Sequence, residues 1–211
     1  MFFEALERLR SIAVRHRGKR YTPEGLTHLI RMQFRDPGLR FITERSDDVE
    51  KGSWTIKGEY RPYDDEQGDP SIHITLVYPT RERVCYIDRH RWEDMGFHIA
   101  DVVTHEYLHQ YYCRRRSYRY GKGYGTIKLL RYQETMQDYL GCEDEVLAHA
   151  FNVASEMIVY DRPMERTKTW RLYRKHFKQD PKVLTQLEKH TNKYLKQLEQ
   201  SNEQVIRRVS N

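Results

Sequence analysis

The sequence predicts an α+β fold in which helices and strands are segregated along the chain. Two observations point to this class. Apolar residues recur at helical spacing towards both ends of the 211-residue chain, and they alternate with polar residues between about residues 54 and 87. Separate runs of helices and strands are typical of α+β proteins. A chain of this length can bury the core of one domain and carry a helical appendage.

Two helices are expected before the strands. In residues 1–17 apolar side chains recur every three or four positions, and Gly18 ends the pattern. Thr22 and Pro23 then have the residue types of an N-cap and a first helical turn. We expect this second helix to run to about residue 34.

Strand-like runs follow the N-terminal helices. Polar and apolar residues alternate over 54–60 and 72–78, and a shorter run covers 84–87. The polar segment 64–70 is predicted to be a turn. These runs predict an antiparallel sheet of at least three strands, and a weaker strand is expected near residues 39–43.

Helical periodicity returns after the strands. It covers residues 96–113 and is interrupted by a loop with three glycines over 114–125. A helix is then expected to resume, and Gly141 precedes another over residues 143–160. Two further helices are expected at about 167–177 and 181–198. No internal repeat or low-complexity tract interrupts this order.

The positive charge of the protein lies in its C-terminal quarter. Residues 162–211 contain 13 Lys or Arg against 5 Asp or Glu, whereas the formal net charge of the whole chain is +6. We therefore expect one domain over 1–161 and a basic helical extension over 162–211 that packs on it. A solvated helix face explains such a charge, and so does a surface for an acidic partner or a nucleic acid. The basic, tyrosine-bearing loop 114–131 offers the same two interpretations.

The cysteines and the N-terminus bear on the compartment. Three cysteines without a short C-x-x-C spacing favour a reducing environment. The first ten residues include acids and lack the apolar core of a signal peptide. No stretch approaches the roughly 20 apolar residues that span a bilayer. We expect a cytoplasmic protein without a membrane partner.

Residues 104–112 read T-H-E-Y-L-H-Q-Y-Y and contain the pattern H-E-x-x-H. Residues four apart lie on one face of a helix, so His105 and His109 can direct two imidazoles at one Zn²⁺ ion. Glu106 lies one position round the helix and can act as general base towards a metal-activated water. The alternative is an ordinary helix with two histidines that are exposed to solvent or satisfied within the core.

A catalytic zinc needs a third protein ligand and an open position. Glu143, Asp144 and Glu145 begin a helix whose body is rich in alanine. Favourable interaction with the helix dipole explains acids at this place, but the small residues that follow also allow the close approach of another helix. Cys113, four residues after His109, is an alternative third ligand.

The two motifs together resemble those of the gluzincin metallopeptidases. In that class a Glu on a downstream helix follows H-E-x-x-H, and here E-V-L-A-H follows H-E-Y-L-H after 35 residues. The segment is similar to the corresponding helix of ImmA/IrrE-type bacterial proteases and of small phage-encoded metallopeptidase-like proteins. The resemblance covers about residues 97–160. It implies Zn²⁺ held by His105, His109 and Glu145, with the two acids before Glu145 as fallbacks, and a host-cytoplasmic location if the protein is phage-encoded.

Three further residues are candidates for supporting roles. His149 stands where the family pattern has Asp, and it is expected to assist a ligand or the reacting carbonyl, or to act as a spacer. Asp101, one turn before His105, can accept the second ring N–H of that ligand. Tyr124 is a candidate to stabilise the tetrahedral intermediate if the loop acts as a lid over the substrate. Two neighbouring tyrosines, Tyr118 and Tyr120, are alternatives to it.

The sequence therefore predicts a zinc metallopeptidase that acts on a protein or peptide substrate. One alternative is a non-catalytic zinc protein of a virion, an assembly or a binding module. The other is a nucleic-acid-associated protease like those of the SprT type, which resemble this chain in H-E-x-x-H but take a third His where this chain offers Glu145 first.

Overall fold

The computed structural model describes residues 2–119, 121–124 and 135–209, without the side chains of 89–90 and 202–209. The described chain is α+β, as the sequence predicts. It packs as two compact units, Met1–Gln110 and Tyr111–Asn211, which we call the first and the second unit. The domain boundary expected near residue 161 stays a prediction.

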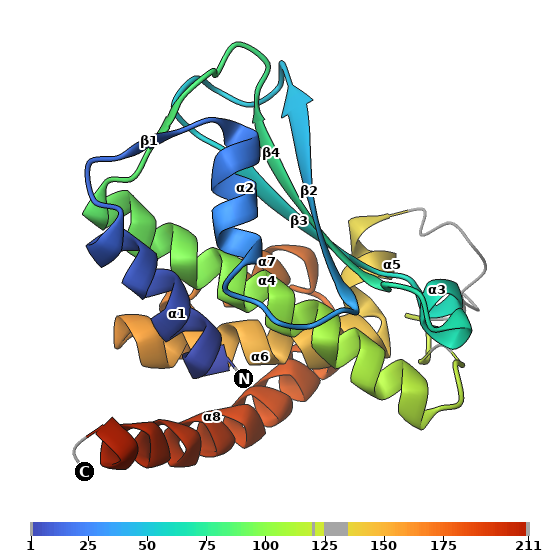
Figure 1. Cartoon of the computed structure of the whole chain (residues 1–211). Helices are drawn as coiled ribbons and strands as arrows, with labels where there is room; N and C mark the ends of the chain where they lie inside the picture. The colour runs from blue at the N-terminus through green and yellow to red at the C-terminus, as the bar shows by residue number, and fades with distance from the viewer. Residues whose placement is uncertain (1, 120, 125–134, 210–211) are drawn as a thin grey trace. The chain divides into compact units, whose positions relative to one another are not determined.

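Two helices open the first unit. Helix α1 (Phe2–Arg15) buries its apolar stripe, and Gly18 follows it at a φ of +75°, a conformation that glycine adopts without steric cost. Helix α2 (Pro23–Arg31) begins as the sequence predicts, because the Thr22 side chain accepts a hydrogen bond from the backbone N–H of Gly25 at 3.1 Å. Figure 1 shows α2 against one face of the sheet.

The main sheet has three strands in the order β2-β4-β3. Strand β4 (Ile72–Pro79) pairs antiparallel with β3 (Thr55–Tyr60) and parallel with β2 (Leu39–Ser46). The sheet is therefore mixed, which corrects the expectation of an antiparallel sheet. The alternation of polar and apolar residues along a strand indicates which side chains point to each face of the sheet. It does not indicate which strand lies beside it.

A second, two-stranded sheet contains the run expected to extend the first. Strand β5 (Cys85–Tyr86) pairs antiparallel with β1 (Arg20–Tyr21), the short segment before α2. Strand β4, buried along almost its whole length, is thus the central strand of the main sheet.

The segment predicted as a polar turn is the short helix α3 (Pro62–Gln67). Its buried Asp65 accepts hydrogen bonds from the Tyr60 hydroxyl at 2.9 Å, the Ser71 hydroxyl at 3.2 Å and the Gln110 amide at 2.9 Å. These bonds fix the end of β3, the start of β4 and the second half of the next helix to one carboxylate.

That next helix, α4 (Arg89–Arg115), is longer than the predicted segment 96–113. It anchors to α1 through Trp92, whose indole N–H donates to the carbonyl of Leu9 at 2.7 Å. The boundary between the two units falls within this helix, after Gln110.

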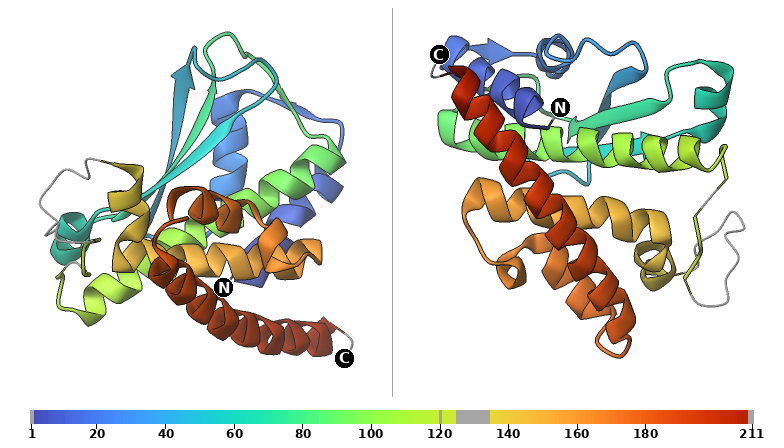
Figure 2. Two further views of the ribbon diagram at one scale, coloured as in Figure 1. Left: turned by 180° about the vertical axis from the view of Figure 1, so that it is seen from behind. Right: turned by 90° about the horizontal axis from the view of Figure 1, so that it is seen from below.

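The second unit is helical where it is described. Its elements are α5 (Met136–Gly141), α6 (Glu143–Tyr160), the 3-10 turn η1 (Met164–Arg166), α7 (Lys168–His176) and α8 (Pro181–Val209). Helix α8 crosses α6 (Figure 2), and the Thr191 hydroxyl donates to the carbonyl of Ala150 at 3.3 Å. The rings of Phe151 and Tyr194 meet edge to face beside this contact.

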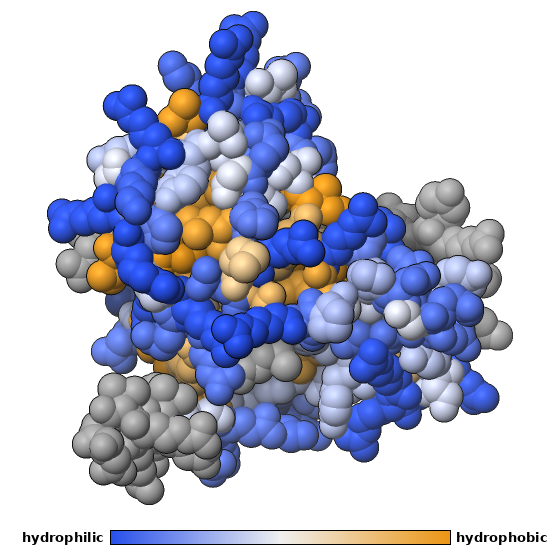
Figure 3. Space-filling model, viewed as in Figure 1, coloured by the Kyte–Doolittle hydropathy of each residue, from blue (hydrophilic) through white to orange (hydrophobic). Residues whose placement is uncertain are grey.

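The surface is strongly polar. On the face drawn in Figure 3, apolar side chains gather around α2 and hydrophilic residues surround them. Among the helices described here, none is long and apolar enough to cross a membrane.

Candidate metal centre

Helix α4 brings the two histidines of H-E-x-x-H together in the first unit. The Nε2 atoms of His105 and His109 lie 3.0 Å apart, and the two rings meet at 69° with centroids 4.7 Å apart. His105 and Glu106 are buried, with 9% and 7% of their surface exposed. The spacing of four residues within this helix therefore directs both imidazoles at one point, as the sequence predicts.

The carboxylate of Glu106 lies against the backbone of strand β3 at Gly58. A Cβ atom built on Gly58 would overlap the Glu106 side chain, with Cγ at 2.7 Å and Cδ at 2.8 Å. The absence of a side chain at this position is what lets the carboxylate approach the strand. Gly58 is not among the residues that the sequence motifs predict, although an isolated glycine within a strand pattern is a known sign of close approach by another group.

On helix α6, Glu145 and His149 form a pair in the second unit. The His149 Nδ1 atom lies 3.4 Å from Glu145 Oε2 and 3.1 Å from the Glu145 carbonyl oxygen. The ring of His149 also contacts Tyr139 and Tyr173. The structure therefore places a carboxylate and an imidazole one turn apart on this helix, and both are donor types that zinc accepts.

The two other acids at the start of α6 hold a neighbouring loop. Glu143 accepts a hydrogen bond from the backbone N–H of Lys122 at 3.0 Å, and Asp144 accepts one from that of Gly121 at 3.0 Å. Asp144 also forms an ion pair with Arg116. These contacts give Glu143 and Asp144 a structural role in fixing Arg116, Gly121 and Lys122, which the fallback assignment did not foresee.

Tyr124 packs within the second unit. Its hydroxyl donates to Asp180 Oδ2 at 3.1 Å, and its ring meets Phe177 edge to face. Burial raises the pKa of Tyr124, and the hydrogen bond to Asp180 raises it further. Of the two alternatives, Tyr118 has a positive φ of 60°, and Tyr120 lies outside the described residues. The role of Tyr124 at a tetrahedral intermediate stays a prediction.

The remaining candidates lie on α4. Asp101 is half-buried one turn before His105, and Cys113 is buried one turn after His109. Their roles as hydrogen-bond acceptor and alternative ligand stay predictions.

The chemistry of the α4 pair fits a zinc ion. Two nitrogen ligands at 2.0–2.1 Å in tetrahedral geometry are about 3.3 Å apart, close to the 3.0 Å between the two Nε2 atoms. In the absence of a metal, the same distance is a hydrogen bond between one protonated and one unprotonated ring nitrogen.

Comparison with known proteins identifies no relative of this chain. No protein-family model, no curated protein and no solved structure matches this chain. The resemblance to gluzincins accordingly rests on the two motifs and their order in the sequence.

Proposed function

We propose that this protein is a zinc-dependent metallopeptidase that cleaves peptide bonds. The observation that carries the proposal is the convergence of the His105 and His109 Nε2 atoms, with the Glu106 carboxylate beside them on the same helix. His105 and His109 are the first two ligands of the proposed zinc, and Glu145 is the third ligand that the resemblance of the motifs implies.

The residues have separate tasks in the proposed reaction. Zinc, when bound, would polarise the peptide carbonyl and acidify a water molecule. Glu106 would accept the proton of the attacking water and deliver it to the amine that leaves. His149 would orient Glu145 through its Nδ1 atom, or replace it as a ligand, since the two side chains are 3.4 Å apart.

The state of the thiols supports a reducing location. None of the three cysteines, all of which lie in the described part of the chain, forms a disulfide, and we place the protein in the cytoplasm.

The zinc content of purified variants tests the proposal. Elemental analysis should find one zinc per chain in the wild type and in Glu106→Gln, and almost none in His105→Asn or His109→Asn. Glu145→Gln should bind zinc at least tenfold more weakly, because it removes one of the three protein ligands of the proposed site. Absence of zinc from the wild type, even after Zn²⁺ is added at neutral pH, would overturn the proposal.

Matched controls separate ligation from general damage. Glu143→Gln makes the same change two residues before Glu145 and should keep its zinc, because the Glu143 carboxylate binds a backbone N–H. His98→Asn makes the histidine change elsewhere on α4 and should also keep it. Tight zinc in a protein that cleaves no peptide, including peptides with aromatic residues, would favour the structural-zinc alternative.

Nucleic-acid binding is a second candidate function, favoured by helix α8. Its exposed Lys189, Lys193 and Lys196 line a hollow of about 390 Å³ whose other lining side chains are amides. Such a row of cations suits a phosphate backbone. Binding to duplex DNA that weakens steeply with salt, persists without zinc and is lost in a triple Lys→Gln variant would support this function; salt-independent or absent binding would reject it.

A further inference from the structure

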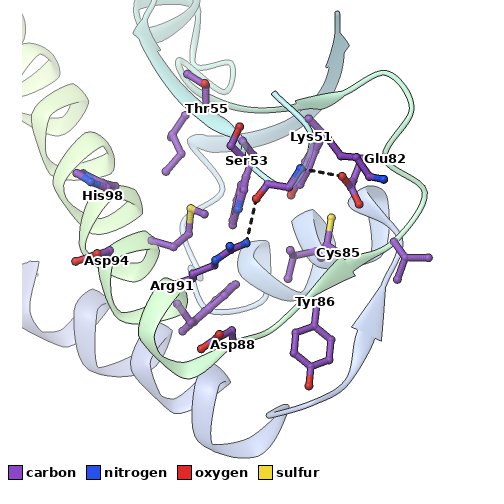
Figure 4. A pocket seen from close by; sticks show the side chains of 18 of the residues that line it. Lys51, Ser53, Thr55, Glu82, Cys85, Tyr86, Asp88, Arg91, Asp94 and His98 are labelled. Carbon is purple, nitrogen blue, oxygen red and sulfur yellow. Dashed lines mark hydrogen bonds between the residues drawn. The ribbon is translucent and has the colours of Figure 1, made fainter. Parts of the chain in front are cut away.

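The first unit contains a pocket of about 860 Å³ that none of the proposed catalytic residues lines. Its walls are the first half of α4, the segment that leads into β3, and the chain from the end of β4 to β5 (Figure 4). This volume lies in the range of pockets that bind small molecules or a few residues of a peptide.

Aromatic rings form one wall of the pocket. Trp54 stacks on Tyr78 with ring centroids 5.3 Å apart, and it meets Trp92 at 6.3 Å. The polar atoms of two of these rings are engaged elsewhere, since Trp92 donates to the Leu9 carbonyl and the Tyr78 hydroxyl hydrogen-bonds with Thr27. Tyr78 and Trp92 are buried, with 1% and 3% of their surface exposed, so it is the half-buried Trp54, backed by these two rings, that offers apolar ring surface to an occupant.

The charges around the pocket nearly balance. The ionisable acids and bases that line it, other than histidine, are Lys51, Arg91, Glu82, Asp88 and Asp94. Arg91 donates to the carbonyl of Gly52 at 3.3 Å, and the N–H of Gly52 donates to Glu82 at 3.2 Å, so these side chains bridge one end of the pocket (Figure 4). An uncharged, apolar occupant suits this setting better than a phosphate or a carboxylate.

Two walls of the pocket lead to Glu106. On α4, Val102 lines the pocket, and Glu106 follows one turn later, about 6 Å along the axis. On β3, Ile56 lines the pocket, and Gly58, which lies against Glu106, is about 7 Å further along the strand. A group held in the pocket would therefore be about two residues of extended peptide from the Glu106 carboxylate.

Strand β3 offers a way to hold such a peptide. Within the described residues, β3 pairs with β4 on one side, and no strand pairs with its other side. An extended peptide can add to an edge of this kind through backbone hydrogen bonds, while a neighbouring pocket selects its side chain. Strand β4 does not provide such an edge, because β2 and β3 pair with its two sides.

We propose that the pocket binds an aromatic or large aliphatic side chain of an extended peptide that lies along β3. The pocket thereby determines which peptides the proposed peptidase cleaves. The cleavage rests on the proposed function, whereas the binding needs only the first unit and no metal.

Peptide binding to the zinc-free protein tests this inference. The probes are acetyl-Ala-Ala-Phe-Ala-Ala-amide and the same peptide with Asp in place of Phe, titrated in the presence of a chelator. Two of the three tryptophans of the chain line the pocket, so tryptophan fluorescence reports occupancy. The Phe peptide should bind at least tenfold more tightly. It should also slow the alkylation of Cys85, which lines the pocket, and the Asp peptide should not.

Two variants of exposed valines make a matched pair. Val84 lines the pocket with 46% of its surface exposed, so Val84→Glu adds a charge there at little cost to folding. Val14 on α1 is 81% exposed and does not line the pocket, so Val14→Glu is the control. Val84→Glu should lower the affinity for the Phe peptide at least tenfold, and Val14→Glu should leave it unchanged. Trp54→Ala should give the same loss through the aromatic wall.

The outcomes separate this inference from the proposed function. If the two peptides bind equally or not at all, or if both valine variants behave alike, the pocket does not select an apolar side chain, whatever the zinc content. If the Phe peptide binds as expected and the protein takes up no zinc, the pocket is a peptide-binding site and the peptidase proposal fails.

Discussion

The contact between Glu106 and Gly58 gives a sharp test of the proposed general base. Replacement of Gly58 with Ala leaves both histidines of H-E-x-x-H in place and adds one atom next to the Glu106 carboxylate. The new Cβ would lie 2.7 Å from Cγ and 2.8 Å from Cδ of Glu106, whereas ordinary contact begins near 3.4 Å. The carboxylate must therefore move by about 0.6 Å or more.

The size of the expected effect follows from that displacement. A shift of about 1 Å at a catalytic group can lower the rate by about 100-fold, so we expect Gly58→Ala to reduce kcat/KM by about 10- to 100-fold. The end of a flexible side chain moves at small cost, so the free energy of unfolding should change by no more than about 1 kcal/mol. Zinc content should stay at the wild-type level.

The assay is the cleavage of a mixture of Phe-containing peptides, followed by mass spectrometry, together with elemental analysis and thermal unfolding of the same samples. Gly96→Ala is the matched control, because a Cβ at Gly96 makes an ordinary 3.4 Å contact with the Leu9 side chain. Wild-type kcat/KM in Gly58→Ala, with zinc bound, would refute the reasoning: the position of the Glu106 carboxylate would then have no part in the rate.

Three further predictions concern other parts of the chain. Asp65→Ala should lower the free energy of unfolding by about 2–4 kcal/mol, since it removes a buried acceptor from the buried Ser71 hydroxyl and from the half-buried Tyr60 and Gln110 donors; a loss below 1 kcal/mol in chemical denaturation would contradict this. Burial, and then the charges of Lys189 and Lys193, lower the pKa of His190 from 6.5. The unfolded chain then binds this proton more readily than the folded one, so stability should fall as the pH drops below 6.5. Replacement of His190 with Gln should flatten that slope, and an unchanged slope would speak against it. Burial, with a nearby acid, raises the pKa of Cys85 to about 11, so its alkylation rate should rise about tenfold per pH unit from pH 8 to 10; a plateau below pH 9 would contradict the shift.

Much of the fold could be predicted from the sequence because the signals are local. Helix α6 has the predicted bounds, and α2 has the predicted N-cap, since caps and periodicity depend on residues within one or two turns. The convergence of His105 and His109 is local in the same sense, because four residues make one helical turn. The assignment of zinc, of peptide cleavage and of Glu145 as a ligand stays a prediction from the motifs.

Only the tertiary structure decided which distant segments meet. It placed β2 parallel to β4, paired β5 with β1, and turned the expected polar turn into α3 with its buried Asp65. It also brought Gly58 of a strand against Glu106 of a helix and enclosed the aromatic pocket of the first unit. Alternation and spacing fix which face a side chain points to, whereas the partner on that face is selected by packing between residues far apart in the chain, which no local pattern encodes.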